Sequence, residues 1–193
     1  MDEMEEAFMN SSIVPAIVPV VPNNTVTVSF GNKEVNLGNF ICAYDTSIMP
    51  FIYFEPENGS LYALFYINAD VGFAFSGSRE LVYLNYLVVN IPDNNVYEGD
   101  QATPYQSYLP FPGAGPTRNL FMVYKQNATI DVAEIIPQIA GSSYLFNMTD
   151  FVLVNQLGDP IAGNFFLTQL TNCNSKEEES NEDSDASCSC CCQ

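Results

Sequence analysis

Histidine is absent from the 193 residues of this chain, and lysine and arginine together number only five. Without an imidazole the chain cannot form a Ser-His-Asp or Cys-His catalytic site, a histidine metal site, or a histidine general acid or base. With so few cations it is poorly suited to displace counterions from nucleic acid or to bind an anionic membrane by charge. We therefore expect a protein that is not an enzyme, needs no cofactor and binds no nucleic acid.

Apolar residues, in contrast, are plentiful: they make up 47% of the chain, and 13% of the chain is aromatic. The length suits one domain, and the abundance of Tyr and Phe favours strands. Half of the net charge of −18 lies in the first six and the last twenty residues. We therefore predict a mostly β domain over residues 13–173, between a disordered acidic arm (1–12) and a disordered, acidic, cysteine-rich tail (174–193).

Patterns typical of strands recur through the predicted domain. Alternation over residues 25–30, a turn at Gly31-Asn32 and a return over 34–37 predict a hairpin. Longer apolar runs predict four further strands, over 51–55, 61–68, 81–91 and 120–125. The Pro- and Gly-rich stretch 92–119 is predicted to be a long ordered loop.

Helices are expected to be few and short. Residues 131–140 are weakly amphipathic, but Pro137 is expected to break a helix there. Residues 148–155 are predicted to form a short helix, with Asn147 as its N-cap and Gly158 just beyond its end.

Four stretches occur in the order in which a known family carries its motifs. They are Asn68-Ala69-Asp70, Leu87-Val88-Val89-Asn90-Ile91-Pro92, Gly113-Ala114-Gly115-Pro116-Thr117-Arg118 and Gly158-Asp159-Pro160-Ile161-Ala162-Gly163-Asn164-Phe165-Phe166. They match, in turn, the family's Asp-Pro-Asp motif, the strand after its histidine–aromatic pair, its Gly-x-Gly-x-His-Arg loop and its C-terminal signature. On these motifs the chain resembles the phosphatidylethanolamine-binding protein (PEBP) family, including its antigen-like invertebrate branch.

This resemblance implies a fold and a pocket. The fold would be a sandwich of a large central antiparallel sheet and a smaller sheet, with short C-terminal helices. The pocket would lie at one end of the sandwich and hold a phosphate-like head group. The family's associations are lipid head-group binding, modulation of kinase signalling and inhibition of serine proteases.

The chain departs from the family within that pocket. Asp70 remains from the Asp-Pro-Asp motif, whereas Asn85 and Thr117 stand where the family has histidines, and Asn119 stands where it has a tyrosine. An anion would then face the Asp70 carboxylate without an imidazolium to offset it, so phosphate binding should be lost or much weakened. Asp70 could still be a ligand group, or it could be paired with Arg118 or with backbone amides. The candidate ligand-binding residues are Asp70, Asn85, Tyr86, Leu109, Thr117 and Asn119.

Cysteines crowd the end of the chain, at Cys188, Cys190, Cys191 and Cys192. Acylation, which would tether the chain to a membrane, is one interpretation. Thiolate binding of Zn²⁺ or Cu(I) is another, and an unstructured end with mixed disulfides is a third. Cys42 and Cys173 are expected to be buried apolar thiols rather than a disulfide.

The function expected first is that of a non-enzymatic binding or regulatory protein, a monomer that acts on a protein partner through its surface. The alternative is a carrier of a lipid or a small neutral or apolar ligand, in a cavity lined by Phe65, Tyr86, Leu109 and Phe121. An enzyme is the third possibility, although Asp70 has no evident acid–base partner.

The cellular compartment is predicted from the first ten residues. They are acidic and lack the basic segment that begins a signal peptide. Taken from its first residue, the chain is expected in the cytoplasm, and it would be secreted if the true N-terminus differs.

Overall fold

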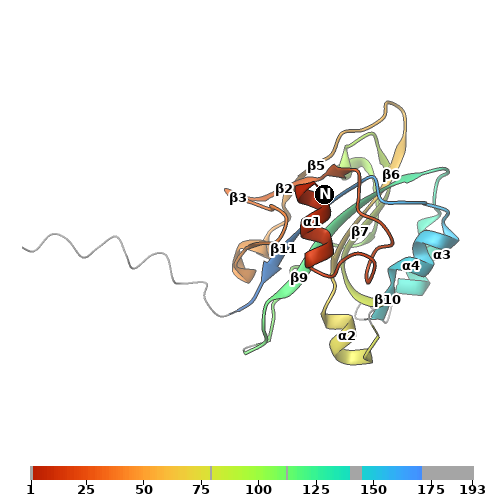
Figure 1. The fold of residues 1–193 in the computed structure, drawn as a ribbon. Helices are drawn as coiled ribbons and strands as arrows, with labels where there is room; N and C mark the ends of the chain where they lie inside the picture. Colours follow the sequence, from red (N-terminus) through yellow and green to blue (C-terminus); the bar gives the residue numbers. More distant parts are fainter. Residues whose placement is uncertain (1, 79, 112, 140–144, 171–193) are drawn as a thin grey trace, which may run out of the picture.

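The computed structural model describes residues 2–78, 80–111, 113–139 and 145–170. Its centre is an eight-stranded sheet in which β1, β11, β9, β6, β7 and β10 follow one another, while β4 pairs with β11 and β8 pairs with β7 (Figure 1). Their bounds are β1 Asn24–Thr25, β4 Asn39–Phe40, β6 Leu61–Asn68, β7 Leu81–Pro92, β8 Asp100–Thr103, β9 Thr117–Gln126, β10 Phe146–Asn147 and β11 Ala162–Thr168. A second sheet consists of β3 (Lys33–Glu34), β2 (Thr27–Phe30) and β5 (Phe51–Tyr53), in that order. The predicted mostly β sandwich is confirmed.

The large sheet is mixed rather than wholly antiparallel. Strands β6, β7, β9 and β11 pair antiparallel, but β1 and β4 both run parallel to β11. The four longer predicted strands correspond to β5, β6, β7 and β9, and the predicted hairpin is formed by β2 and β3. The stretch 92–119, predicted as a loop, also contains β8 and a 3₁₀ turn, η2 (Val96–Glu98).

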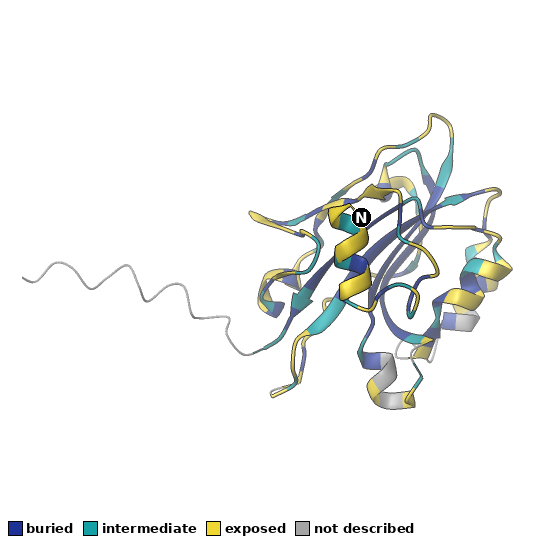
Figure 2. Ribbon diagram, in the orientation of Figure 1, coloured by how far each residue is buried: buried dark blue, intermediate teal, exposed yellow. Residues whose placement is uncertain are grey.

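Both faces of the large sheet are covered, which explains why its strands read as unbroken apolar runs. Along β6, Phe65 and Ile67 face one hydrophobic core, and Leu64 and Tyr66 face the other. The first core is closed by the helices α1 (Glu3–Asn10), α3 (Val132–Ile139) and α4 (Met148–Val154). The second is closed by the small sheet, so the long strands β6, β7, β9 and β11 are almost wholly buried (Figure 2).

The acidic N-terminal residues are folded, contrary to the expected disordered arm. Residues Glu3–Asn10 form helix α1, and the Asp2 side chain caps it by accepting a hydrogen bond from the Glu5 N–H at 2.7 Å. Three glutamates in the first turn suit the positive end of the helix dipole. Phe8 is fully buried and packs edge-on against Phe165, with ring centroids 5.2 Å apart.

The other helices are short. Helix α4 begins after Asn147, whose side chain accepts from the Asp150 N–H as an N-cap, as predicted. The predicted break at Pro137 is wrong, because α3 runs through it to Ile139. Ile135 and Ile139, four residues apart, are both buried in the first core, and this packing outweighs the backbone bond that a proline removes. In the described part of the chain, no helix is long and apolar enough to cross a membrane.

The C-terminal signature is architectural. Gly158 has a φ of +73°, a conformation that favours glycine, in the turn between α4 and β11. Gly163 lies within β11, where an added Cβ would come within 2.8 Å of Pro22 Cγ and 3.0 Å of Met122 Sδ. These two glycines allow the last strand to enter the sheet beneath the N-terminal segment.

Candidate functional site

Polar side chains gather at one end of the large sheet, on the face toward the small sheet. Asn68 ends β6 and lies opposite Asn119 of β9, and Thr168 ends β11 opposite Thr117. Because neighbouring strands run antiparallel, the end of one meets the beginning of the next. This end is where the PEBP resemblance implied a pocket.

Asn68 is the central residue of this polar cluster. Its Nδ2 donates to Thr117 Oγ1 at 3.0 Å and to Asn119 Oδ1 at 3.1 Å. Its Oδ1 accepts from the backbone N–H of Asp70 and of Val71, at the start of helix α2 (Val71–Ser76). In the sequence, Asn68 is recognisable only as a replaced motif residue. Its role depends on strand register and could not be read from the motif.

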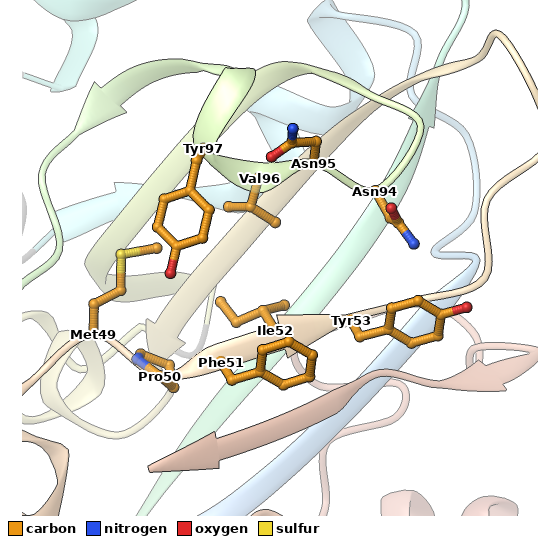
Figure 3. Close-up of a pocket in the computed structure, with 9 residues that line it drawn as sticks. All are labelled: Met49, Pro50, Phe51, Ile52, Tyr53, Asn94, Asn95, Val96 and Tyr97. Atoms are coloured by element: carbon orange, nitrogen blue, oxygen red, sulfur yellow. The ribbon is translucent and has the colours of Figure 1, made fainter. Parts of the chain in front are cut away.

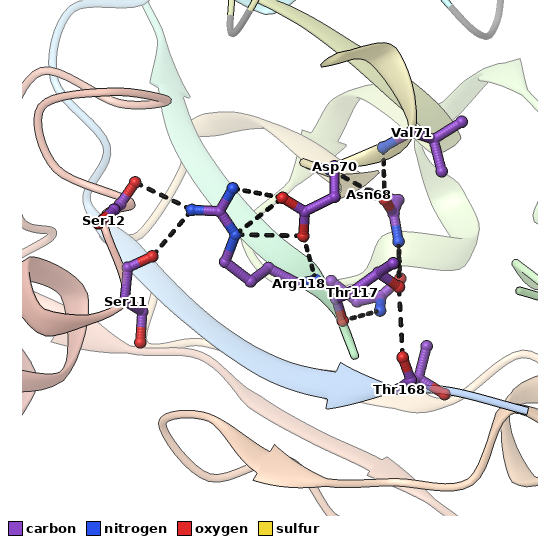
Figure 4. Close-up of polar contacts among 9 residues, drawn as sticks. Ser11, Ser12, Asn68, Asp70, Val71, Thr117, Arg118 and Thr168 are labelled. Carbon is purple, nitrogen blue, oxygen red and sulfur yellow. Dashed lines mark hydrogen bonds and ion pairs between the residues drawn. The ribbon is translucent and has the colours of Figure 1, made fainter. Parts of the chain in front are cut away.

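Asp70 is held by Arg118 (Figure 4). Arg118 Nε donates to both carboxylate oxygens, at 3.1 and 3.2 Å, the Arg118 backbone N–H donates to Oδ2 at 2.7 Å, and Nη2 forms an ion pair with Oδ1. The remaining guanidinium nitrogen, Nη1, donates to the carbonyls of Ser11 and Ser12 at 2.8 and 3.0 Å. The pairing that the sequence left open is therefore present, and it also fastens the N-terminal segment to the sheet.

The Thr117 hydroxyl both accepts and donates a hydrogen bond within the protein. Its Oγ1 accepts from Asn68 and donates to the Thr168 carbonyl at 3.3 Å. Asn119 Nδ2 donates to the Thr117 carbonyl at 3.1 Å. Two of the three residues that replace the family's imidazole and phenol groups are thus engaged in bonds within the protein.

Asn85, the third replacement, is fully buried. Its side-chain Nδ2 donates to the Gln106 carbonyl at 2.9 Å, and the backbone carbonyl of Asn85 accepts from the Gln106 N–H at 2.8 Å. Asn85 therefore holds the segment after β8 against β7. Its Oδ1 has no hydrogen-bond partner among the described residues, and the same is true of the buried Thr168 Oγ1.

An aromatic stack lies next to the polar cluster. Tyr66 stacks on Phe121, with centroids 4.4 Å apart, and on Tyr105 at 5.7 Å, while Tyr86 meets Tyr105 edge-on at 5.8 Å. Burial raises the pKa of Tyr86 to about 12 and also raises the pKa of Tyr66 and Tyr105. These phenols are therefore uncharged at physiological pH, so their oxygen atoms can form hydrogen bonds only as neutral hydroxyl groups.

The structure does not bring together the four residues expected to line an apolar cavity. Tyr86 and Phe121 share the core beneath the small sheet, but Phe65 lies in the opposite core against Tyr124 and Phe151. Leu109 is exposed. Alternation along β6 places Phe65 on the face opposite Tyr66, and because Tyr66 stacks on Phe121, Phe65 cannot share a cavity with Phe121.

Cysteine pairing also differs from expectation. Cys42 is half-buried and disulfide-bonded, not a free thiol, and it is the only cysteine in the described ranges. Cys173 and the terminal cysteines Cys188, Cys190, Cys191 and Cys192 lie outside those ranges. Within the ranges, no group of three His, Cys, Asp or Glu residues is placed to hold a metal ion.

Several curated proteins are similar in sequence to this chain. No family model matches the chain. The 26 kDa secreted antigen of Toxocara canis is 32% identical over 165 residues, which cover 84% of this chain and 63% of the antigen. The chain therefore spans less than two thirds of that relative's length.

Solved structures share the fold. Carboxypeptidase Y inhibitor, in complex with its cognate proteinase, has a TM-score of 0.70 at 16% identity and covers 86% of this chain and 94% of its own. The phosphatidylethanolamine-binding protein of Plasmodium vivax has a TM-score of 0.60 at 20% identity and covers 86% of this chain and 97% of its own. At these low sequence identities, the similarity shows only that the fold is shared.

Proposed function

Because the chain has the fold of the phosphatidylethanolamine-binding protein family, as its motifs predicted, we propose that it is a non-enzymatic binding or regulatory protein with a degenerate phosphate site. It acts through protein interactions at its surface and works as a monomer.

The bonds of Asp70 and Arg118 carry this proposal. The only carboxylate retained from the family motif is neutralised by Arg118, and that guanidinium also bonds to Ser11 and Ser12. A phosphate that took Arg118 would leave Asp70 uncompensated and would release the N-terminal segment. A phosphate beside the intact pair would still be repelled by the Asp70 carboxylate, because Arg118, which is already bonded to that carboxylate, would offset the repulsion only in part.

The residues in place of the family's histidines do not offset that repulsion. Asn85 Nδ2 and Thr117 Oγ1–H already donate to backbone carbonyls. Neither group can become a cation, so neither can form the charge-assisted bonds that hold phosphate most strongly.

Restoring the histidines tests the proposal. In the variant Asn85→His with Thr117→His, imidazolium donors return beside Asp70, and we expect affinity for phosphoethanolamine to rise at least about tenfold, or 1.4 kcal/mol. Isothermal titration calorimetry at about pH 6 measures it, since an unperturbed imidazole is largely protonated there.

A control variant, Thr129→His with Thr149→His, adds the same two groups at exposed positions outside the cluster. An equal gain in phosphoethanolamine affinity in both variants would contradict the proposal, because it would show that added positive charge anywhere on the protein raises the affinity. Since Asn85 is fully buried, Thr117→His alone is the second variant, and melting curves establish that each protein is folded.

A carrier of a small neutral ligand is the second candidate. It is favoured by the buried Asn85 Oδ1 and Thr168 Oγ1, which have no partner among the described residues, at the same end of the sheet. A neutral N–H or O–H donor would satisfy such acceptors. Native mass spectrometry of purified protein distinguishes the two: a retained small molecule supports a carrier, and ligand-free protein with co-purified proteins supports the interaction role.

Secretion suits the chain better than the cytoplasm that its first residues suggested. Two observations support it: Cys42 is disulfide-bonded, and the similar Toxocara protein is described as secreted. Structural disulfides persist in oxidising compartments and are rare in the cytosol.

A further inference from the structure

A groove lies between β5 and the segment 94–97 (Figure 3). Its volume is about 320 Å³, at the lower end of the range for ligand pockets. The lining residues are Met49, Pro50, Phe51, Ile52, Tyr53, Asn94, Asn95, Val96 and Tyr97. None of them belongs to the polar cluster around Asn68.

The backbone of Ile52 faces this groove. Among the strands of the described residues, β5 pairs only with β2, where Ile52 lies opposite Val28. Val28 directs its carbonyl to β3, because it accepts from the Val35 N–H at 2.9 Å. In an antiparallel sheet the N–H and C=O of one residue point to the same side, and the next residue points to the other. The N–H and C=O of Ile52 therefore point away from β2, toward segment 94–97.

Two neighbouring groups on this edge are not available to a partner strand. Pro50 has no N–H, and the Phe54 carbonyl accepts from Asn94 Nδ2 at 3.1 Å. No backbone partner for Ile52 on this side occurs in the described ranges. The N–H and C=O of Ile52 are the two groups that a single residue of an added antiparallel strand would bond.

Exposed aromatic rings flank the free backbone groups. Phe51 and Tyr53 lie on the same face of β5 and are 60% and 42% exposed, and Tyr97 on the opposite wall is 78% exposed. Exposed clusters of this kind mark interaction sites, and aromatic residues often dominate the energy of protein interfaces. Figure 3 shows the Tyr97 side chain extending from segment 94–97 toward Met49 and Pro50, with Phe51 and Tyr53 along the β5 wall.

Charge indicates the kind of partner. No lysine or arginine lines the groove, while Glu55 lies two residues beyond the end of β5 and Glu98 is the last residue of η2, and both are exposed. Glu55 Oε2 accepts from the Tyr53 hydroxyl at 2.7 Å, which places a carboxylate at the rim. A basic partner complements this surface, whereas the chain's own acidic residues 174–193 would be repelled.

We propose that the free edge of β5 binds an extended, basic peptide segment of a partner protein by β-strand addition. One residue of the segment exchanges two backbone hydrogen bonds with Ile52, and the side chains on either side of it pack against Phe51, Tyr53 and Tyr97. The inference rests on the proposed function, since it assigns a surface to the protein interaction.

Selection from a phage-displayed library of linear dodecapeptides against the full chain tests it. We expect enriched peptides to be rich in Lys or Arg, and to protect the Ile52 amide from hydrogen exchange. Affinity should fall at least about tenfold in Tyr97→Ala, and by a similar factor when the peptide residue opposite Ile52 is N-methylated. The matched control is Tyr44→Ala, whose ring is 61% exposed but does not line the groove, and it should bind normally.

The inference is overturned if no peptide is enriched, or if the enriched peptides bind Tyr97→Ala as well as the unmodified protein. Acidic or sequence-independent binders would also contradict it. These failures leave the proposed function standing, because the protein could bind its partner elsewhere. Tight phosphate binding would remove the degenerate-site proposal without affecting peptide binding at β5.

Discussion

At the scale of single residues, Arg118 has the widest structural role among the residues of the site. It neutralises Asp70, and it holds the chain that follows α1 through the carbonyls of Ser11 and Ser12. The side chains of Arg118 and Asp70 are 19% and 31% exposed, so water screens this pair only in part. One residue thus both pairs with the retained acid and fastens the N-terminal segment to the sheet.

Arg118→Ala should therefore lower the free energy of unfolding by about 2 kcal/mol, because it leaves Asp70 and two carbonyls without their partner. Urea unfolding measures the loss. Lys125→Ala is the matched control: its ion pair with Glu57 is exposed, and its loss should cost less than about 1 kcal/mol. Equal losses in the two variants would show that Arg118 is an ordinary surface charge.

Sequence motifs predicted some of the site residues and missed others for a physical reason. Asp70, Thr117 and Asn119 were found because they occupy motif positions, and the Asp70–Arg118 pair was among the alternatives considered. Thr168 and Gln106 were missed, because their place depends on the register of β11 and on the path of the segment after β8. Neither leaves a local pattern in the sequence.

At the scale of elements, strands that are buried on both faces were predicted best from the sequence. Strands β6 and β7 are buried on both faces, so their apolar runs identified them almost to the residue. Helix α1 was missed because acids dominate its sequence and its only fully buried side chain is Phe8. Strand β8 was missed because its sequence, Asp-Gln-Ala-Thr, carries little strand propensity, and pairing with β7 decides its conformation.

Phe8→Ala tests whether α1 is an integral part of the fold. We expect a loss of about 3–5 kcal/mol in unfolding free energy, the usual cost of truncating a buried phenylalanine. Met9→Ala, next to it and nearly half exposed, should change stability by less than about 1 kcal/mol. Thermal and urea unfolding of both variants provide the measurement. A Phe8→Ala protein as stable as the unmodified one would mean that the acidic arm is free in solution, as its composition suggested.

At the scale of the whole molecule, the protein is strongly acidic and has few lysines and arginines, and its Cys42 is disulfide-bonded. A charge of −18 disfavours anionic partners at long range and favours basic ones. The disulfide at Cys42 favours an oxidising compartment. Together these properties support the proposed secretion and the proposed basic partner.

Alkylation of the denatured, unreduced protein checks the disulfide. Peptide mass spectrometry should find Cys42 unmodified before reduction and fully alkylated after it, because a disulfide sulfur does not react with iodoacetamide. Alkylation of Cys42 without prior reduction would contradict the pairing, and with it the main structural support for secretion.

The central claim is that the acid retained in this pocket is bonded to its own arginine and that the pocket no longer accepts an anion. Titration of ¹⁵N-labelled protein with phosphoethanolamine, followed through the amide signals of Asp70, Arg118 and Asn119, tests it most directly. We predict no saturable shift of these signals up to about 1 mM ligand, equivalent to a binding free energy weaker than about −4 kcal/mol. Saturation at micromolar concentration would contradict the account.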